Sequence, residues 1–221
     1  MKKWNEFDYD IQRVISNQSI APGSYILKFK KITPFLAGQV VALGISRDIE
    51  PRYYSIASGE NDELISILYS ERVEGQLTPM LSMLKPGDNL MVSKPFGTYT
   101  QVKPSPIFIA AGTGIAPFIS MLMSNKAKGA TLIHGARYTD YFYYSDYLEN
   151  TLGNRYIRCC SRCEQGSLFV GRVTDFVKQW NDLDPERPYY LCGSAEMVVE
   201  TRDILISRGV PVSNINSEIY F

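Results

Sequence analysis

The pattern of hydrophobic residues changes near Lys103-Pro104-Ser105-Pro106, and this change constrains the fold more than any other feature. Before it, short runs of alternating apolar and polar residues are separated by turn-forming residues, as in antiparallel sheets. After it, strands that are apolar on both faces alternate with helical segments, as in parallel sheets covered by helices. We therefore predict two domains, residues 1–102 and residues 103–221.

The first half is predicted to form a small antiparallel β-barrel. The run from Tyr25 to Lys31 alternates most clearly, and Pro22-Gly23 before it favours a turn. One helix interrupts the strands, with Thr78 as its possible N-cap and Pro86-Gly87 beyond its end. The six expected strands are 7–16, 25–31, 40–45, 54–58, 63–70 and 89–94, and the helix is 78–84.

The second half is predicted to form an α/β domain with a parallel sheet. Ligands of such sheets bind at the carboxyl ends of the strands, so the residues that follow each strand are the candidates for function. The expected strands are 107–111, 130–136, 156–160, 189–192 and 215–220. The expected helices are 115–124, 143–150, 173–180 and 197–207.

Composition narrows the functional classes. Of the 221 residues, 45% are hydrophobic and 21% are charged, and the formal net charge is zero. A neutral chain gives no reason to expect binding to nucleic acid or to a membrane surface. The sequence contains no apolar run of about 18 residues, so no transmembrane helix is predicted. The first residues lack the apolar core of a signal peptide. We expect a cytoplasmic protein.

The four cysteines are predicted to be free thiols. Cys159 and Cys160 are adjacent on an expected strand, where their side chains point to opposite faces, so they make a poor disulfide or metal pair. Cys163 and Cys192 complete the set, and His134 is the one histidine. We therefore expect no metal site, and a structural role for His134.

Two segments of the first half are candidates for ligand binding. In Arg52-Tyr53-Tyr54-Ser55, the arginine fork suits a pyrophosphate, a tyrosine offers a ring for stacking, and the serine hydroxyl can reach a ring nitrogen. The alternative is ordinary barrel packing. Gly75-Gln76-Leu77-Thr78 opens the expected helix, where backbone N–H groups can bind an anion. The alternative there is a simple turn with an N-cap.

The second half offers three further candidates. Gly112-Thr113-Gly114 follows an apolar strand and opens a helix, although Pro117 stands where a dinucleotide-binding motif would have its third glycine. Cys192-Gly193 ends a strand, and Cys192 would project from that end toward a bound ligand. The alternative is that Cys192 is simply a small buried side chain. Three arginines follow strand ends and could together hold a 2′-phosphate, namely Arg137, Arg162 and Arg172. The alternative is that they are scattered surface residues.

Taken in order, these segments resemble the ferredoxin–NADP reductase family, and in particular its short bacterial members. The resemblance runs from about Tyr9 to Phe221 and includes the R-x-Y-S segment, the G-x-L-T helix start, the G-T-G-x-A-P loop, the C-G segment and an aromatic C-terminus. It also includes His134–Arg137, Ser161-Arg162 and Gly171–Asp175. The resemblance implies an FAD-binding barrel followed by an NADP-binding α/β domain.

The resemblance also implies residue roles. Around the flavin, Arg52 would hold the pyrophosphate, Tyr54 would pack on the ring and Ser55 would hydrogen-bond near N5. Cys192 and Glu218 would lie beside the nicotinamide, and Tyr220 would stack on the flavin. The 2′-phosphate would be read by Arg137, Ser161, Arg162 and Arg172. The remaining expected cofactor-binding residues are Tyr53, Leu68, Tyr69, Leu77, Thr78, Thr113, Gly193 and Phe221.

The implied activity is FAD-mediated electron transfer between NADPH and a one-electron carrier protein, either ferredoxin or flavodoxin. Catalytic roles would fall to Ser55, Cys192, Glu218 and Tyr220. FAD is favoured over FMN, and a monomer is expected. Three alternatives stay open: an NAD(P)H flavin reductase, the electron-transfer subunit of a larger oxidoreductase, and a nucleotide-binding regulatory module without turnover.

Overall fold

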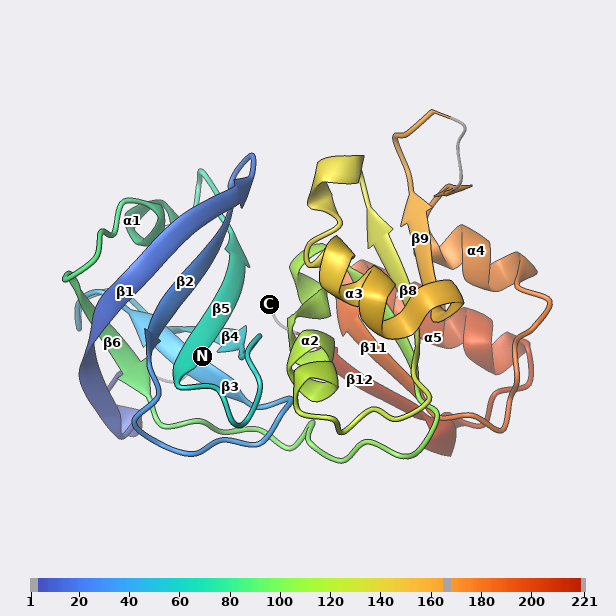
Figure 1. Ribbon diagram of the computed structural model, residues 1–221, viewed down its shortest axis with the longest axis horizontal. Helices are drawn as coiled ribbons and strands as arrows, with labels where there is room; N and C mark the ends of the chain where they lie inside the picture. The colour runs from blue at the N-terminus through green and yellow to red at the C-terminus, as the bar shows by residue number, and fades with distance from the viewer. Residues whose placement is uncertain (1–3, 165–167, 220–221) are drawn as a thin grey trace. The chain divides into compact units, whose positions relative to one another are not determined.

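The structure, a computed structural model, describes residues 4–164 and 168–219. The chain divides into two compact units, each with its own sheet (Figure 1). Unit 1 comprises Met1–Gln101 with Ala116–Lys126, and unit 2 comprises Val102–Ile115 with Ala127–Phe221. Each unit also has its own hydrophobic core, so each is described by itself.

Unit 1 contains the predicted antiparallel barrel. Its strands follow the order β4-β3-β6-β1-β2-β5, and a bridge between Ile56 and Ile67 joins the chain after β4 to β5 and closes the sheet. This confirms the fold class predicted for the first half. The strands are β1 (Tyr9–Ala21), β2 (Ser24–Lys30), β3 (Val40–Gly44), β4 (Arg52–Ser55), β5 (Leu64–Ser70) and β6 (Asn89–Ser93), and the helix is α1 (Thr78–Ser82).

The barrel interior is filled by the alternating apolar residues of the strands. Leu27 and Phe29 of β2 are 0% and 1% exposed, and they pack with Leu43, Ile67 and Leu90 in one core. Burying a side chain of this size stabilises the fold by about 1.5–3 kcal/mol. The alternation that predicted β2 therefore also identifies its buried face.

The first strand is longer than its sequence pattern predicts. β1 continues to Ala21, past the polar residues Asn17, Gln18 and Ser19. These residues pair antiparallel with β2, with irregular register between Val14 and Ser16 and again between Ser19 and Ala21. Backbone pairing, which leaves no mark on hydrophobic periodicity, extends the strand.

Unit 2 contains the predicted parallel sheet, in the order β10-β9-β8-β7-β11-β12. From the central strand β7 the chain first builds one side of the sheet through β8 to β10 and then the other side through β11 and β12. The strand order therefore reverses between β7 and β11, where ligands of such sheets bind. The strands are β7 (Ile107–Ala111), β8 (Thr131–Ala136), β9 (Tyr156–Cys160), β10 (Phe169–Val170), β11 (Tyr189–Gly193) and β12 (Ile215–Ile219).

Helices cover both faces of this sheet (Figure 1). On one face, Ile133 and Leu191 pack in one core with Val177 of α4 (Val173–Gln179) and Leu205 of α5 (Ala195–Ser207). On the other face lies α3 (Ser145–Leu152), and its Glu149 pairs at 2.7 Å with Arg158 of β9. The α/β fold class predicted for the second half is confirmed.

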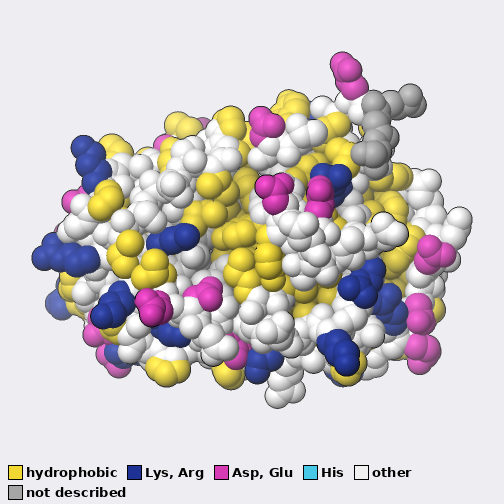
Figure 2. Space-filling model, viewed as in Figure 1, with side chains coloured by type: hydrophobic (Ala, Val, Ile, Leu, Met, Phe, Trp, Pro, Cys, Tyr) yellow, Lys and Arg dark blue, Asp and Glu magenta, His cyan; other side chains and the backbone are white. Residues whose placement is uncertain are grey.

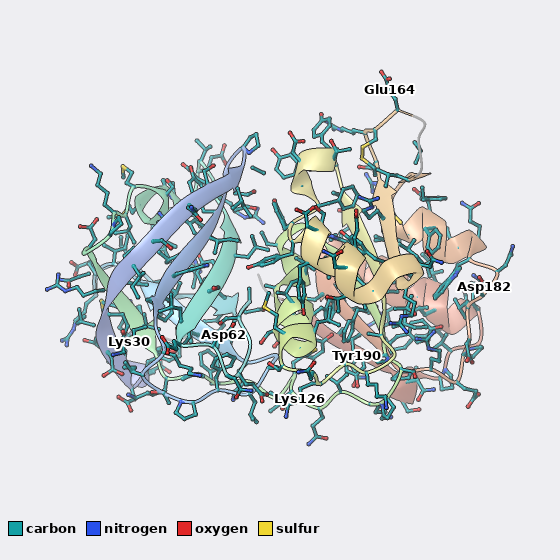
Figure 3. All side chains as sticks on the ribbon, in the orientation of Figure 1. Lys30, Asp62, Lys126, Glu164, Asp182 and Tyr190 are labelled. Carbon is teal, nitrogen blue, oxygen red and sulfur yellow. A yellow bond between two sulfur atoms is a disulfide. The ribbon has the colours of Figure 1, made fainter. Side chains whose placement is uncertain are left out.

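The remaining helix, α2 (Ala116–Met123), groups with unit 1 although it follows the first strand of unit 2. The hydroxyl of Ser120 donates a hydrogen bond to the Ser58 carbonyl at 2.7 Å. Lys126, just beyond the helix, pairs with Glu60 at 3.4 Å (Lys126 is labelled in Figure 3). Side chains after the change of pattern therefore take part in the barrel unit.

The short features that were not predicted include a turn, a strand and the N-terminal contact of Trp4. The chain from Gly112 to Ile115 forms a 3₁₀ turn, η2, before α2 begins. β10 has only two residues, too few to show any periodicity. Trp4, in a 3₁₀ turn at Trp4–Glu6, is 4% exposed and donates from its ring nitrogen to the Ile49 carbonyl at 3.1 Å.

Among the described residues, none of the helices combines the length and apolarity required to cross a membrane. On the face that Figure 2 shows, basic and acidic side chains are interspersed. This view agrees with the balanced formal charge of the sequence.

Candidate functional site

The first part of the candidate site is strand β4. It pairs antiparallel with β3, with Leu43 opposite Arg52 and Val41 opposite Tyr54. The Arg52 side chain is 39% exposed and meets Glu50 at 3.5 Å. Exposed ion pairs of this kind contribute about 0–1 kcal/mol. A phosphate that accepts two hydrogen bonds from the guanidinium fork can therefore compete with Glu50.

The two tyrosines of β4 lie on opposite faces of the strand. The Tyr53 ring meets the Phe96 ring edge-on at 5.2 Å. The Tyr54 ring meets that of the core residue Tyr69 at 6.3 Å. Burial raises the pKa of the Tyr54 phenol, so the ring stays neutral at physiological pH. Ser55 is only 8% exposed and shares the face of Tyr53. Because Tyr54 and Ser55 lie on opposite faces of the strand, one flat ligand could contact both only along the edge of β4.

The expected flavin contacts on β5 have buried side chains. Tyr69 is 1% exposed, and its hydroxyl donates to the side-chain oxygen of Asn17 at 3.1 Å. Its ring also stacks on Tyr25 at 5.3 Å. Leu68 is 3% exposed. Backbone and side chain of both residues are therefore buried.

The start of α1 differs from the prediction. Leu77, not Thr78, occupies the N-cap position, and the Leu77 side chain is buried in the barrel core. The Thr78 hydroxyl accepts a hydrogen bond from the Arg72 backbone N–H at 2.8 Å and donates to the Arg72 carbonyl at 3.3 Å. The hydroxyl therefore fastens the preceding loop, and the prediction of Thr78 as the N-cap was wrong.

In unit 2, the glycine-containing turn η2 lies against β11. A Cβ on Gly114 would come within 2.4 Å of the Cys192 carbonyl oxygen, so this position requires glycine. Gly112 has φ +56°, and a Cβ there would meet nothing within 4 Å. The turn between them carries Thr113, which is partly exposed. The first glycine therefore leaves open space at the end of β7, while the second lets two backbone segments pack.

Cys192 and Glu218 lie opposite each other on the paired strands β11 and β12. Cys192 is 1% exposed. Burial raises the pKa of its thiol, and the nearby Glu218 carboxylate raises it further. Cys192 is therefore a neutral thiol and not a nucleophile. Gly193 ends β11, and the next hydroxyl, on Ser194, accepts from Met197 N at 3.3 Å to cap α5.

The structure brings the segments of the three predicted phosphate-binding arginines to one edge of the sheet. Pairing continues past the ends of β8 and β9, where Arg162 N donates to the Arg137 carbonyl at 2.9 Å. Gly171 N donates to the Cys160 carbonyl at 2.9 Å, which brings Arg172 to the same edge. All three arginines are exposed, and Ser161 lies beside them. The only ion pair among them is a 3.9 Å contact between Arg172 and Glu196, within the described residues.

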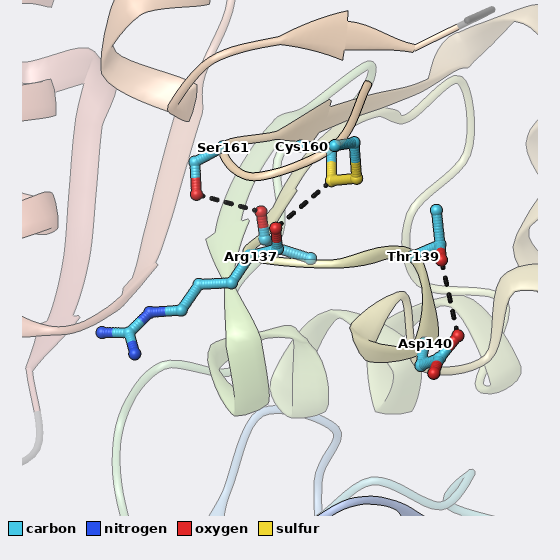
Figure 4. Close-up of a disulfide and its surroundings, with 7 residues drawn as sticks. Arg137, Thr139, Asp140, Cys160 and Ser161 are labelled. Atoms are coloured by element: carbon cyan, nitrogen blue, oxygen red, sulfur yellow. Dashed lines mark hydrogen bonds between the residues drawn. A yellow bond between two sulfur atoms is a disulfide. The ribbon is translucent and has the colours of Figure 1, made fainter. Parts of the chain in front are cut away.

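A disulfide lies at this same edge, contrary to the prediction of free thiols. Cys160 and Cys163 are bonded, with their Cα atoms 5.5 Å apart, while Cys159 and Cys192 are free. The turn after β9 brings Cys163 back toward Cys160. The Arg137 carbonyl faces the Cys160 sulfur at 3.4 Å, while the Arg137 side chain extends away from the disulfide (Figure 4). Glu164 lies at the outer tip of this loop (Figure 3).

The contacts of two nearby residues, Tyr138 and His134, were not predicted. Tyr138 is 45% exposed, and its hydroxyl accepts a hydrogen bond from Arg162 at 3.3 Å. Its position directly after Arg137 is the signal that could have identified it. His134 is 0% exposed and pairs through Nδ1 with the Tyr156 hydroxyl at 3.0 Å. Burial lowers the pKa of His134 to about 3, against a smaller effect of the Gly112 backbone.

Tyr220 and Phe221, the aromatic residues expected over the flavin and the adenine, lie outside the described residues. Their roles stay predictions. The described chain ends with β12, which carries Glu218.

Comparisons with known proteins agree with this arrangement. Residues 108–203 match the family model of the oxidoreductase NAD-binding domain. A ferredoxin–NADP reductase of Pseudomonas aeruginosa is 31% identical over an alignment that covers 81% of each chain. The electron transfer component of toluate 1,2-dioxygenase from Pseudomonas putida is 26% identical over 92% of this chain and 65% of that protein. A ferredoxin–NADP⁺ reductase from Neisseria gonorrhoeae, solved with FAD and NADP, superposes with a TM-score of 0.86 at 20% identity, over 96% of this chain and 99% of that one.

A barrel, a parallel sheet and a matched nucleotide-binding domain together define a two-unit oxidoreductase. The identity with the Pseudomonas aeruginosa protein, over four fifths of both chains, makes the assignment more specific. The chain belongs to the ferredoxin–NADP reductase family.

Proposed function

We propose that this protein is a ferredoxin–NADP reductase that holds FAD on unit 1 and NADP(H) on unit 2, and that it exchanges electrons with a small one-electron carrier protein. The observation that carries the proposal is the convergence of three exposed arginine segments at one strand-end edge of the sheet. The Pseudomonas aeruginosa relative bears the name of this activity, and the Neisseria gonorrhoeae structure contains both cofactors.

The donor set of β4 fits FAD. Arg52 presents a partly exposed guanidinium fork, which suits the pyrophosphate better than a point charge would. Tyr54 supplies a neutral ring for the flavin face, and the Ser55 hydroxyl a donor for a ring nitrogen. The buried Leu68 and Tyr69 would support the site from the barrel core, and the backbone N–H groups of Leu77 and Thr78 would complete the set. The Tyr53 ring supports β4 through its contact with Phe96.

The strand-end edge of unit 2 fits NADP(H). The open space over Gly112 leaves room for the nucleotide next to Thr113. Arg137, Arg162 and Arg172, with the Ser161 hydroxyl, would hold the 2′-phosphate. The exposed ring of Tyr138 lies at the same edge and offers the adenine a flat surface.

When bound, FAD supplies the conversion between the two-electron chemistry of nicotinamide and the one-electron chemistry of a carrier protein. The residues of this chain bind and orient the two groups. The neutral Cys192 thiol and the Glu218 carboxylate, opposite each other on β11 and β12, would lie beside the nicotinamide. Gly193 leaves room for the Met197 side chain, which a Cβ at this position would meet. Tyr220 and Phe221, which lie outside the described residues, would cover the flavin and the adenine as the family resemblance implies.

The test is an anaerobic titration of the purified protein, followed in its visible spectrum, with NADPH and separately with NADH. We expect a bound flavin that NADPH bleaches much faster than NADH does. Equal rates would contradict the proposed reading of the 2′-phosphate. A protein that takes up no FAD would contradict the whole proposal.

The relative from toluate dioxygenase supports a second candidate function, that of an electron-transfer component of a larger oxidoreductase. The two functions differ in the electron acceptor. A ferredoxin or flavodoxin that restores the flavin spectrum at catalytic rates supports the first, and reduction of an oxygenase component alone supports the second. A flavin that stays bound during gel filtration argues against a flavin reductase that releases its product.

The expected carrier is ferredoxin or flavodoxin, and the protein is proposed to act as a cytoplasmic monomer. The interspersed charges on the face of Figure 2 do not form a field of one sign there. Salt would then weaken docking only modestly. Carrier-dependent rates measured between low and high ionic strength test this expectation.

A further inference from the structure

We propose that Cys160 and Cys163 form a redox-modification site, and that their disulfide state sets the affinity of unit 2 for the 2′-phosphate of NADP(H). This inference rests on the proposed function, because it concerns the same arginine-rich edge. The two cysteines enclose Ser161 and Arg162, two of the four residues proposed to read that phosphate. Any change in this bond therefore acts on the backbone that carries them.

The short span of the disulfide argues against a purely structural role. The two cysteines are separated by three positions in the sequence. Cross-links that close such short loops restrict the unfolded chain least and stabilise the fold least. A C-x-x-C pair next to a parallel α/β sheet is instead typical of thiol–disulfide chemistry.

The two sulfurs differ in access. Cys160 is 0% exposed, whereas Cys163 is partly exposed in the turn beyond the strand. A thiolate from solvent can therefore reach the Cys163 sulfur more readily. The neighbouring Cys159 is 0% exposed, and burial raises the pKa of its thiol to about 12, so it remains inert.

The reductant that we infer is a dithiol, small or protein-borne. One of its thiolates attacks the Cys163 sulfur, the bond to Cys160 breaks, and the Cys160 thiolate leaves and takes a proton. The second thiol of the reductant then displaces Cys163, which also takes a proton. Two electrons and two protons pass to the protein, and the dithiol becomes a disulfide. Oxidation by a disulfide of the same class reverses the sequence.

Reduction changes the contacts of Arg137. In the disulfide, the Cys160 sulfur lies 3.4 Å from the Arg137 carbonyl but has no proton to donate. The thiol formed on reduction can donate to this carbonyl, which already accepts from Arg162 N. At the same time the turn over Ser161 and Arg162 loses its covalent closure. The oxidised form therefore holds the 2′-phosphate contacts ready, and the reduced form must order them on binding.

The experiment compares the binding of two probes, 2′,5′-ADP and 5′-ADP, by calorimetry on the full chain after treatment with oxidised glutathione or with reduced dithiothreitol. Ordering a side chain costs about 0.5–1.5 kcal/mol, so we expect 2′,5′-ADP to bind about 2- to 10-fold more weakly to the reduced protein. The affinity for 5′-ADP should change less than 2-fold. Alkylation in denaturant should detect two thiols in the oxidised and four in the reduced protein, as the two free cysteines and the total of four require.

Variants separate the effect from general damage. Cys163→Ser keeps the buried Cys160 in place, should bind 2′,5′-ADP like the reduced protein, and should ignore the redox treatment. Cys159→Ser is the matched control, because it leaves the pair intact and should keep the full response.

Three outcomes are distinguishable. Equal 2′,5′-ADP affinity in both redox states, with the preference over 5′-ADP retained, would overturn the redox proposal alone. Four thiols after oxidation would overturn it as well. If the oxidised protein showed no preference for 2′,5′-ADP, the proposed NADP function would fail first, and its redox control would fail with it.

Discussion

The two candidate half-sites differ in how their side chains are used by the fold. On the barrel, Tyr69 and Leu77 are buried in the core, and the Thr78 hydroxyl is hydrogen-bonded to the loop at Arg72. At the strand ends of unit 2, Arg137 and Arg162 are exposed, and it is their backbones that are held. Apart from the partly exposed Arg52, the ligand contacts expected on the barrel therefore belong to the packed structure, whereas those expected on the sheet edge are added to it.

This difference matches what each half is proposed to bind. A cofactor that stays bound suits a surface whose shape is set by packing, because little has to be ordered on binding. A nucleotide that must enter and leave suits exposed cationic side chains, which give specificity without a deep apolar contact. Mutations should therefore damage folding and cofactor retention in unit 1, and selectivity alone at the edge of unit 2.

The largest effect is expected from removing the arginine cluster. Replacing Arg137, Arg162 and Arg172 by alanine should weaken NADPH binding by at least about 100-fold, since each charged hydrogen bond contributes about tenfold or more. NADH binding should be nearly unchanged, because these side chains would meet only the 2′-phosphate. Dissociation constants for both nucleotides test this.

Arg155→Ala is the matched control for the cluster. Arg155 is also exposed but lies at the opposite, amino-terminal end of β9. It should leave both affinities intact. Equal losses of NADPH and NADH binding in the triple variant would mean that the arginines hold the structure and not the phosphate, and the contrast between the halves would disappear.

A smaller effect is expected on the barrel. Arg52→Ala should weaken FAD binding by about 10- to 100-fold, because the forked, charge-assisted contact to the pyrophosphate is lost. The FAD affinity of Arg52→Lys should lie between those of Arg52→Ala and the unmodified protein, since lysine keeps the charge without the fork. FAD retention after gel filtration and fluorescence titration of the apoprotein measure this.

Arg13→Ala serves as the control on the same barrel, because Arg13 is exposed and its guanidinium donates to the Gly87 carbonyl at 2.8 Å. Its FAD affinity should equal that of the unmodified protein. An Arg52→Ala protein that keeps its flavin would move the pyrophosphate site elsewhere on unit 1.

The sequence predicted the two fold classes well, because hydrophobic periodicity reports which faces are buried. The strand 107–111 was predicted with the bounds that β7 has. The end of β1 was not, since Asn17, Gln18 and Ser19 stay in the strand through backbone pairing. The two-residue β10 was missed for lack of any repeat.

The candidate site was less predictable than the fold. Order along the chain suggested that Arg137 and Arg162 meet, and backbone pairing beyond the strand ends brings them together. The local use of the Thr78 hydroxyl could not be predicted, because the loop from Arg72 has no periodic pattern. The Cys160–Cys163 bond was not predicted, because the spacing of the two cysteines does not show that the turn after the strand brings Cys163 back toward Cys160.

The glycines of η2 test whether backbone packing, and not side chains, shapes the sheet edge. Gly114→Ala should destabilise the protein by about 1–3 kcal/mol, because the new Cβ would fall 2.4 Å from the Cys192 carbonyl oxygen. Gly112→Ala should cost about 1–2 kcal/mol, from its positive φ alone. Urea unfolding of both variants measures the difference. A Gly112→Ala protein as unstable as Gly114→Ala or more so would contradict the packing argument.

The smallest effect concerns His134 and depends on pH. Its folded pKa of about 3 lies below the ordinary value of 6.5, so the unfolded chain binds a proton that the folded chain does not. The stability that this neutral histidine contributes is complete above pH 6.5 and is lost as the pH falls from 6.5 toward 3. Since it is the only histidine, the free energy of unfolding should fall by up to about 1.4 kcal/mol per pH unit between pH 6 and 5.

His134→Gln should remove most of this slope, because glutamine can bond the Tyr156 hydroxyl without titrating. Urea unfolding of both proteins at pH 7.5, 6 and 5 measures it, and carboxylates contribute little above pH 5. A slope that persists in the variant would assign the pH dependence to another group. A slope that disappears would show that the stability of unit 2, whose proposed phosphate-binding arginines are exposed, depends on one buried residue that must stay uncharged.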